Sequence, residues 1–181
     1  MKNVSKIVIV PGNHVADVKK SIWYYWCQQH LLKGLNVRRL GIPVILEDMP
    51  DPDAAHRDVW LPFIKQELRC DENTILIGHS SGAEAAMSPE EKESGYYTGE
   101  WQWERIKANA DWIVQFGSTD DPYLPQKEMD YVHEKLGTEY HMYSDKGHFL
   151  LGEFPELVDV VLQKTDMLHH GPQDQTHGLP K

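Results

Sequence analysis

The chain has 181 residues, of which 40% are hydrophobic and 25% are charged, and its formal net charge is −10 at pH 7. This composition is typical of a soluble folded protein, and we expect one domain over residues 1–167. The acidic balance disfavours nucleic acid and anionic membranes as partners, and no stretch is apolar for long enough to span a bilayer. The two cysteines, Cys27 and Cys70, make no disulfide framework and favour a reducing compartment, the cytoplasm or the nucleus.

Apolar runs alternate with helical patterns along the chain, which predicts an α/β fold with a mostly parallel sheet flanked by helices. The expected strands cover residues 6–10, 43–46, 74–77, 112–116 and 139–143. The expected helices cover residues 18–32, 54–69, 83–87, 104–109, 125–136 and 155–165. From Leu168 to Lys181 the chain is rich in Gly, Pro, Gln and His, and we expect a disordered C-terminal tail there.

The segment Gly78-His79-Ser80-Ser81-Gly82 reads G-x-S-x-G and follows the predicted strand 74–77 directly. A strand, a sharp turn and a helix are the context that a nucleophile elbow requires. The flanking glycines allow a strained turn and a close approach of neighbouring backbone. We therefore expect Ser80 to be a catalytic nucleophile at the carboxyl edge of the sheet. The alternative is an ordinary strand-to-helix turn made of small residues.

A nucleophilic serine needs a base, and that base needs an acid that holds it in one tautomer. In hydrolases of this type the chain order is Ser, then Asp or Glu, then His. Asp121 follows the predicted strand 112–116 and precedes Pro122, so we expect it to be the acid, with Asp120 as the alternative. His148 follows Gly147 on the loop after the last predicted strand, and we expect it to be the base.

Several short segments between about residue 6 and residue 162 carry a family resemblance. They are Val8-Ile9-Val10-Pro11-Gly12-Asn13, Met49-Pro50-Asp51-Pro52, Trp60-Leu61-Pro62-Phe63, Gly78-His79-Ser80-Ser81-Gly82, Trp101-Gln102-Trp103-Glu104, Phe116-Gly117-Ser118-Thr119-Asp120-Asp121-Pro122 and Gly147-His148-Phe149. In these segments the chain resembles the retinoblastoma-binding protein 9 family of small serine hydrolases, in the α/β-hydrolase superfamily. The resemblance implies a triad of Ser80, Asp121 and His148 that cleaves an ester or amide of a small-molecule or peptide substrate through an acyl-enzyme.

An oxyanion hole is also expected at such a site. One donor is the backbone N–H of Ser81, at the start of a helix, and the other is expected from Asn13 on the loop after the first strand. The family is rich in glycine just after this Asn, whereas the present chain has His14-Val15-Ala16. Because these residues carry Cβ atoms that disfavour a positive φ, we expect the geometry of this loop to be altered.

A segment is missing between the nucleophile and the acid. The helix pattern after Ser80 ends at Pro89, and the polar residues 90–95 have no strand pattern. Completing that helix and adding its parallel strand would take about 20 residues or more, and the family has them. The chain therefore resembles a family member that lacks an internal segment, and the sheet is expected to lack one inner strand.

The missing strand has two possible consequences for the sheet. Either a gap remains, or strand 112–116 moves over to pair with strand 74–77, which would shift the Asp121 loop by one strand spacing of ~4.8 Å. Because each link of a triad is a hydrogen bond of roughly 3 Å, such a shift would break it. We therefore expect that the hydrolase site is encoded in the sequence but that its assembly is compromised.

Three other features bear on ligands and partners. Trp101 and Trp103 are candidate walls of an apolar substrate pocket, with packing of a loop as the alternative. Leu68-Arg69-Cys70-Asp71-Glu72 spells L-x-C-x-E, the motif that docks on retinoblastoma-type pocket proteins, so a non-catalytic interaction protein is the alternative function. Docking would need an extended, exposed segment, and Leu68 is expected in the core with Trp60 and Ile64. No pattern predicts a cofactor or a metal.

Overall fold

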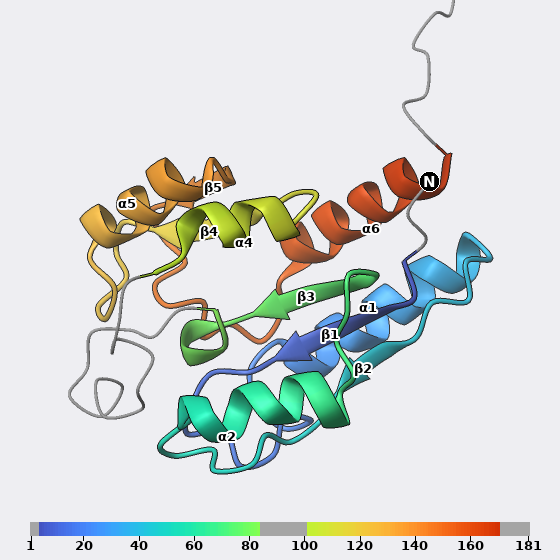
Figure 1. Cartoon of the computed structure of the whole chain (residues 1–181), viewed down its shortest axis with the longest axis horizontal. Helices are drawn as coiled ribbons and strands as arrows, with labels where there is room; N and C mark the ends of the chain where they lie inside the picture. The colour runs from blue at the N-terminus through green and yellow to red at the C-terminus, as the bar shows by residue number, and fades with distance from the viewer. Residues whose placement is uncertain (1–3, 84–100, 171–181) are drawn as a thin grey trace, which may run out of the picture.

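The structure is a computed structural model, and it describes residues 4–83 and 101–170 (Figure 1). These residues contain two parallel sheets. The first has the strand order β2-β1-β3, and the second pairs β4 with β5. The strands are β1 (Lys6–Val10), β2 (Val44–Leu46), β3 (Thr74–Gly78), β4 (Val114–Ser118) and β5 (Glu139–Tyr143). The predicted α/β class is confirmed, and each strand lies within two residues of its predicted range.

Helices connect the strands and cover the sheets. They are α1 (Tyr24–Val37), α2 (Arg57–Pro62), which continues as the π-helical segment η1 (Phe63–Glu67), the 3-10 turn η2 (Ser80–Gly82), α4 (Trp103–Asn109), α5 (Gln126–Leu136) and α6 (Pro155–His170). The predicted helix 83–87 falls mostly outside the described residues. The predicted tail begins at Leu168, whereas α6 continues to His170, and residues 171–181 lie outside the described part.

Strand β1 lies at the centre of the first sheet and is buried on both faces, as is typical of a parallel sheet covered by helices. Ile7 and Ile9 belong to a large core that also contains residues of α1 and α6. Val8 and Val10 point to the opposite face, where they pack with Trp60 of α2. The alternation of side chains along one strand thus divides the domain into two hydrophobic layers.

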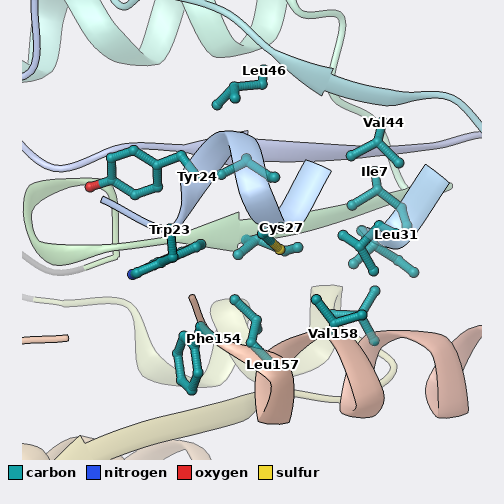
Figure 2. Close-up of a cluster of buried hydrophobic side chains, with 14 of the residues drawn as sticks. Ile7, Trp23, Tyr24, Cys27, Leu31, Val44, Leu46, Phe154, Leu157 and Val158 are labelled. Atoms are coloured by element: carbon teal, nitrogen blue, oxygen red, sulfur yellow. The ribbon is translucent and has the colours of Figure 1, made fainter. Parts of the chain in front are cut away.

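The large core is formed where α1 and α6 pack on the sheet (Figure 2). Side chains of α6 and of the residue before it point toward side chains of α1 and the strands, and the labelled set is Ile7, Trp23, Tyr24, Cys27, Leu31, Val44, Leu46, Phe154, Leu157 and Val158. Helix α1 begins at Tyr24, six residues later than predicted, and extends five residues further, to Val37. The buried positions of α1 are Tyr24, Cys27, Leu31 and Leu35, which are spaced three and four residues apart along one face of the helix.

The second predicted helix, residues 54–69, is regular only over Arg57–Pro62. Pro62 has no N–H to donate, and after it the hydrogen bonds widen, so that the Leu68 N–H donates to the Phe63 carbonyl at 3.0 Å. Trp60 and Leu68 are buried in the second core and Ile64 packs against it, as the sequence predicts.

A gap separates the two sheets. Within residues 4–83 and 101–170, β3 is hydrogen-bonded only to β1 and β4 only to β5, so no strand lies between β3 and β4. Of the two expected consequences of the missing segment, the gap is therefore the one that the structure adopts. Leu76, at the middle of β3, is 50% exposed, which is unusual for an apolar residue of a strand in such a fold.

No helix in the described part of the chain is both long enough and apolar enough to cross a membrane.

The large core generates a prediction about stability. Leu31 of α1 is fully buried, so Leu31→Ala should lower the free energy of unfolding by about 2–5 kcal/mol through lost transfer energy and a residual cavity. The measurement is urea denaturation followed by circular dichroism. Val37→Ala on the same helix, where the side chain is 77% exposed, should change that free energy by less than about 0.5 kcal/mol. Equal effects of the two substitutions would contradict the described packing of α1.

Candidate active site

Ser80 is the first residue of the 3-10 turn η2 and follows the end of β3 by two residues. Its φ is +53°, a value that residues with a side chain rarely adopt, so the backbone is strained at the point where the hydroxyl projects. The flanking glycines make this turn possible. A Cβ on Gly78 would lie 2.3 Å from the Gly82 carbonyl oxygen, and one on Gly82 would lie 2.5 Å from that of Pro11. The backbone at Ser80 therefore has the sharp, glycine-flanked turn that a nucleophile elbow requires.

The structure brings Ser80, Asp121 and His148 together. His148 Nε2 lies 3.0 Å from Ser80 Oγ, and His148 Nδ1 lies 2.8 Å from Asp121 Oδ2. The side chain of Asp121 is 5% exposed and that of His148 is 13% exposed, so both hydrogen bonds lie largely out of water. The expectation that the missing segment disrupts this geometry is not met, because the gap stays open and the loop after β4 is not displaced toward β3.

The Asp121 carboxylate is held from its other side by backbone. Its Oδ1 accepts the N–H of Tyr123 at 2.8 Å and that of Leu124 at 3.0 Å. These two bonds fix the carboxylate so that Oδ2 faces His148. Tyr123 also places its ring edge-on to the His148 imidazole, with the two ring centroids 5.0 Å apart.

Asp120, the alternative acid, serves a different purpose in the structure. Its Oδ1 accepts the Ser118 hydroxyl at 2.5 Å and the Gly147 N–H at 2.9 Å. The hydrogen bond from Ser118, and then the one from Gly147, hold the pKa of Asp120 below its ordinary value. Ser118 Oγ in turn accepts the Lys146 N–H at 3.1 Å. Asp120 and Ser118 thus tie the loop after β4 to the loop that carries His148.

His79, which no sequence argument singled out, connects three parts of the site. His79 Nε2 lies 2.9 Å from the backbone carbonyl oxygen of His148, so this nitrogen must carry the proton and donate it. His79 Nδ1 is then an acceptor, and the Tyr24 hydroxyl donates to it at 2.7 Å. The Tyr24 hydroxyl also accepts the Gly12 N–H at 3.0 Å. One chain of hydrogen bonds therefore joins the loop after β1, the nucleophile elbow and the His148 loop.

Burial keeps His79 neutral. Desolvation is the main cause that lowers the pKa of His79 from 6.5 to about 4, while the hydrogen bond to the His148 carbonyl opposes the shift. Burial also raises the pKa of the Tyr24 hydroxyl to about 12, so this group keeps its proton and remains a donor. Sequence could have drawn attention to His79 because it adjoins Ser80, but only the fold reveals Tyr24 as its partner.

The two expected oxyanion donors belong to the two segments that meet at the nucleophile, η2 and the loop after β1. Ser81 is buried at the start of η2. The loop that carries Asn13 approaches the elbow so closely that a Cβ on Gly12 would lie 3.0 Å from Ser80 Cβ. His14 has a φ of +57° despite its side chain, and its N–H donates to the Pro52 carbonyl at 2.7 Å. Positive φ after Asn13 is thus reached without the glycines of the family.

Trp101 and Trp103, the candidate walls of a substrate pocket, lie at the start of α4. Their rings stack on each other with centroids 5.5 Å apart, and Trp103 packs edge-on against Tyr131 of α5. Neither residue is among those that line the cavity beside Ser80. The structure therefore gives them a packing role, but against α5 and not against the sheet as the alternative had it.

The L-x-C-x-E motif is attached to the domain. Leu68 is 8% exposed and packs with Trp60, while Cys70 packs against the same core. The backbone carbonyls of Leu68 and Arg69 accept hydrogen bonds from Lys6 Nζ at 2.7 Å and 2.5 Å. Docking of this motif as an extended peptide would require the segment to leave the core, so the structure gives no support to a pocket-protein partner.

A cavity of about 280 Å³ opens beside Ser80 and His148. Its walls come from the facing strands β3 and β4 and from α5 and α6. Among the described residues, no group of three His, Cys, Asp or Glu side chains could hold a metal ion.

Comparison with known proteins decides the family. No protein-family model matches the chain. The serine hydrolase RBBP9 (retinoblastoma-binding protein 9) of Rattus norvegicus is 44% identical over 183 residues, which cover 89% of this chain and 96% of the relative. The chain belongs to the RBBP9 family of serine hydrolases. It is therefore a hydrolase.

The same alignment is consistent with a missing segment. Because 89% of 181 residues is about 161, about 22 of the 183 aligned positions are a gap in this chain. This length is enough for the helix end and the strand that the sequence pattern lacks, and the unpaired edges of β3 and β4 indicate where they are absent.

Solved structures confirm the fold of this family member. The ydeN gene product of Bacillus subtilis superposes with a TM-score of 0.75 at 18% identity, over 88% of this chain and 97% of that one. A YdeN-like hydrolase of Pectobacterium atrosepticum gives a TM-score of 0.54 at 19% identity, over 90% of this chain and 91% of the other. At these identities the likeness concerns the fold alone.

The desolvated, partly buried His79 generates a pH prediction. Since the pKa of His79 is about 4 in the folded protein and 6.5 is its ordinary value, the unfolded chain binds a proton first as pH falls. The contribution of neutral His79 to stability is therefore complete above pH 6.5 and is lost between pH 6.5 and about 4, by an amount on the order of 3 kcal/mol. Urea denaturation at a series of pH values measures this loss.

His79→Gln is the matched control for that series, because glutamine offers a donor and an acceptor but does not titrate. The difference in unfolding free energy between the native protein and this variant should change across the window from pH 6.5 to 4. Two parallel profiles would show that His79 titrates normally and that its desolvation does not lower its pKa.

Proposed function

We propose that the protein cleaves an ester or amide bond through an acyl-enzyme in which Ser80 is the nucleophile, His148 the general base and acid, and Asp121 the acid that orients His148. The observation that carries this proposal is the placement of one imidazole between Ser80 Oγ and Asp121 Oδ2, at 3.0 Å and 2.8 Å. Three side chains from loops after three different strands form a continuous hydrogen-bonded series, which is the arrangement that activates a serine hydroxyl.

The first half of the reaction forms the acyl-enzyme. Ser80 Oγ forms a bond to the carbonyl carbon of the substrate while its proton passes to His148 Nε2. His148 then gives that proton to the departing alcohol or amine as the bond between it and the carbonyl carbon breaks. Asp121 holds Nδ1–H and stabilises the imidazolium that exists between these two steps.

The second half releases the acid. A water molecule gives a proton to His148 Nε2 as its oxygen attacks the carbonyl carbon of the acyl-Ser80 ester. The bond between Ser80 Oγ and this carbon then breaks, and Ser80 Oγ recovers the proton from His148. The backbone N–H groups of Ser81 and Asn13 are the donors proposed for the negative oxygen that forms in both halves.

His79 and Tyr24 are proposed as positioning residues for this reaction. Through its bond to the His148 carbonyl, His79 restrains the backbone from which the catalytic imidazole projects. Through Tyr24, the same histidine restrains Gly12 on the loop that carries Asn13. Because His79 is neutral at pH 7, it adds no charge that would oppose protonation of His148, whose ring centroid lies 5.2 Å away.

The nucleophile is tested with a fluorophosphonate probe, which forms a covalent bond to an activated serine with loss of fluoride. Purified protein should gain one probe per chain, and peptide mapping should place it on Ser80. Ser80→Ala should remain unlabelled, while Ser5→Ala, which removes an exposed hydroxyl just before β1, should still react. Soluble, folded protein that takes up no probe would contradict the proposal.

Separate substitutions of the two adjacent aspartates test which of them is the acid of the triad. Asp121→Asn should lower kcat for an activated ester by a factor on the order of 10⁴, because the amide favours the wrong tautomer of His148. Asp120→Asn should lower kcat by less than about tenfold, because Asp120 shapes a loop and does not touch His148. If Asp120→Asn proved the more damaging substitution, the assignment of the acid would be reversed.

A further inference from the structure

The cavity beside Ser80 extends along the gap between the two sheets. Its lining includes Ser80 and His148 at the carboxyl ends of the strands, and Ile75 and Thr138 near their amino ends. From Gly78 back to Ile75 is three residues of β3, or ~10 Å of strand. The space left between β3 and β4 is therefore a slot that begins at the nucleophile and continues into the domain; we call it the interstrand cavity.

The walls of the interstrand cavity are apolar. Side chains of β3 and β4 form the two long sides, and α5 and α6 close it with further aliphatic and aromatic groups. Representative lining residues are Ile75, Ile77, Ile113, Val132, Leu157 and Val160. Apart from Asp121, which faces His148, the described residues that line it include no Asp, Glu, Lys or Arg.

The polar side chains of the lining are already hydrogen-bonded to the protein. Gln115 Nε2 donates to the Met129 carbonyl at 2.8 Å, and Gln115 Oε1 accepts the Thr138 hydroxyl at 3.0 Å. Trp23 Nε1 donates to the Phe149 carbonyl at 2.9 Å. A polar group of a ligand would lose its hydrogen bonds to water in this cavity and would have to displace an existing protein hydrogen bond to replace them. A hydrocarbon has no hydrogen bonds to lose.

The volume sets the size of the ligand. A water-sized group takes up about 30 Å³, so 280 Å³ corresponds to roughly nine methylene-sized groups. A β-strand that replaced the missing one could not occupy this space, since five residues have about 20 backbone heavy atoms before any side chain is counted. The cavity therefore suits one narrow hydrocarbon chain better than it suits a peptide.

We propose that the interstrand cavity binds the acyl group of the substrate, and that the chain is an esterase or amidase selective for an unbranched apolar acyl chain of about eight carbons. This inference rests on the proposed function, because it takes Ser80 as the nucleophile. The acyl carbonyl lies at Ser80, the hydrocarbon runs between β3 and β4, and the alcohol or amine part lies outside the cavity. The gap in the sheet then forms the acyl site.

The test is the hydrolysis of 4-nitrophenyl esters from acetate to dodecanoate. Each added methylene that enters the cavity should raise kcat/KM by roughly three- to fourfold, up to about the octanoate, and longer chains should gain nothing more. A profile that is flat from acetate to octanoate, with Ser80 still labelled by fluorophosphonate, would overturn the inference and leave the proposed function standing.

Two substitutions in the walls should move this profile in opposite directions. Val160 lies on α6, so Val160→Phe should fill part of the cavity and lower the ratio of octanoate to acetate kcat/KM by tenfold or more. Ile113→Ala should instead extend the gain beyond octanoate. Val37→Phe, at a position 77% exposed on α1, is the matched control and should leave the profile unchanged. If neither wall variant moves the profile, the cavity is not the acyl site.

Binding without catalysis separates the two proposals. Octanoic acid should bind saturably to the Ser80→Ala variant, as measured by calorimetry. Adding Val160→Phe should raise the Kd for octanoic acid by about tenfold. This result would support the cavity as a binding site even if the protein cleaved no ester and reacted with no probe. In that case only the proposed chemistry at Ser80 would be refuted. Octanoic acid that fails to bind to folded Ser80→Ala would overturn the inference.

Discussion

The imidazole of His148 is the point at which the two sheets of this protein meet. Ser80 follows β3 of the first sheet, Asp121 follows β4 of the second, and His148 follows β5. Its ring touches Ser80 and Asp121, and its backbone carbonyl accepts from His79. Between β3 and β4 no backbone ladder exists in the described residues. The two sheets are joined by these side-chain bonds and by the large core, which includes the packing of Phe154 on Trp23 and Phe116.

The unpaired edges of β3 and β4 are unfavourable for stability, but they border the cavity that is proposed to bind the acyl group. Inner strand edges normally find partners, because an unpaired N–H or C=O out of water is unfavourable. Here the lost pairing coincides with an apolar cavity that opens at the nucleophile. A ligand that fills the cavity with hydrocarbon would bury the apolar walls from water, although it would not replace the missing backbone bonds. On the proposed placement of the acyl group, substrate binding would therefore also stabilise the folded domain.

Sequence patterns were sufficient to predict an element wherever its position is set by residues that are close together in the chain. The runs of β1 and β5 and the turn at Ser80 are set by residues close to one another in the chain, and their positions could be predicted. The order of Ser80, Asp121 and His148 along the chain could also be read directly. The predicted helix boundaries were wrong where tertiary contacts decide them, as at the start of α1, and where one residue changes the hydrogen bonding, as after Pro62.

The parts that could not be predicted depend on distant pairs. Tyr24 and His79 are 55 residues apart, and no periodicity indicates that their side chains are hydrogen-bonded. The consequence of the missing segment could be reduced to two alternatives, a gap or a shifted strand, but not resolved. That choice depends on two opposing contributions to stability. One is the packing of the core around Phe116 and Phe154, which keeps β4 in place, and the other is the set of backbone hydrogen bonds that β4 would gain by pairing with β3.

The central claim is that the triad assembles across an open gap which also receives the acyl chain. The most direct measurement is a crystal structure of the protein after reaction with an n-octyl fluorophosphonate. The account predicts phosphorus on Ser80 Oγ, His148 still bonded to Asp121, and the octyl chain lying between β3 and β4. A structure in which β4 pairs directly with β3, or in which the octyl chain lies on the surface, would contradict it.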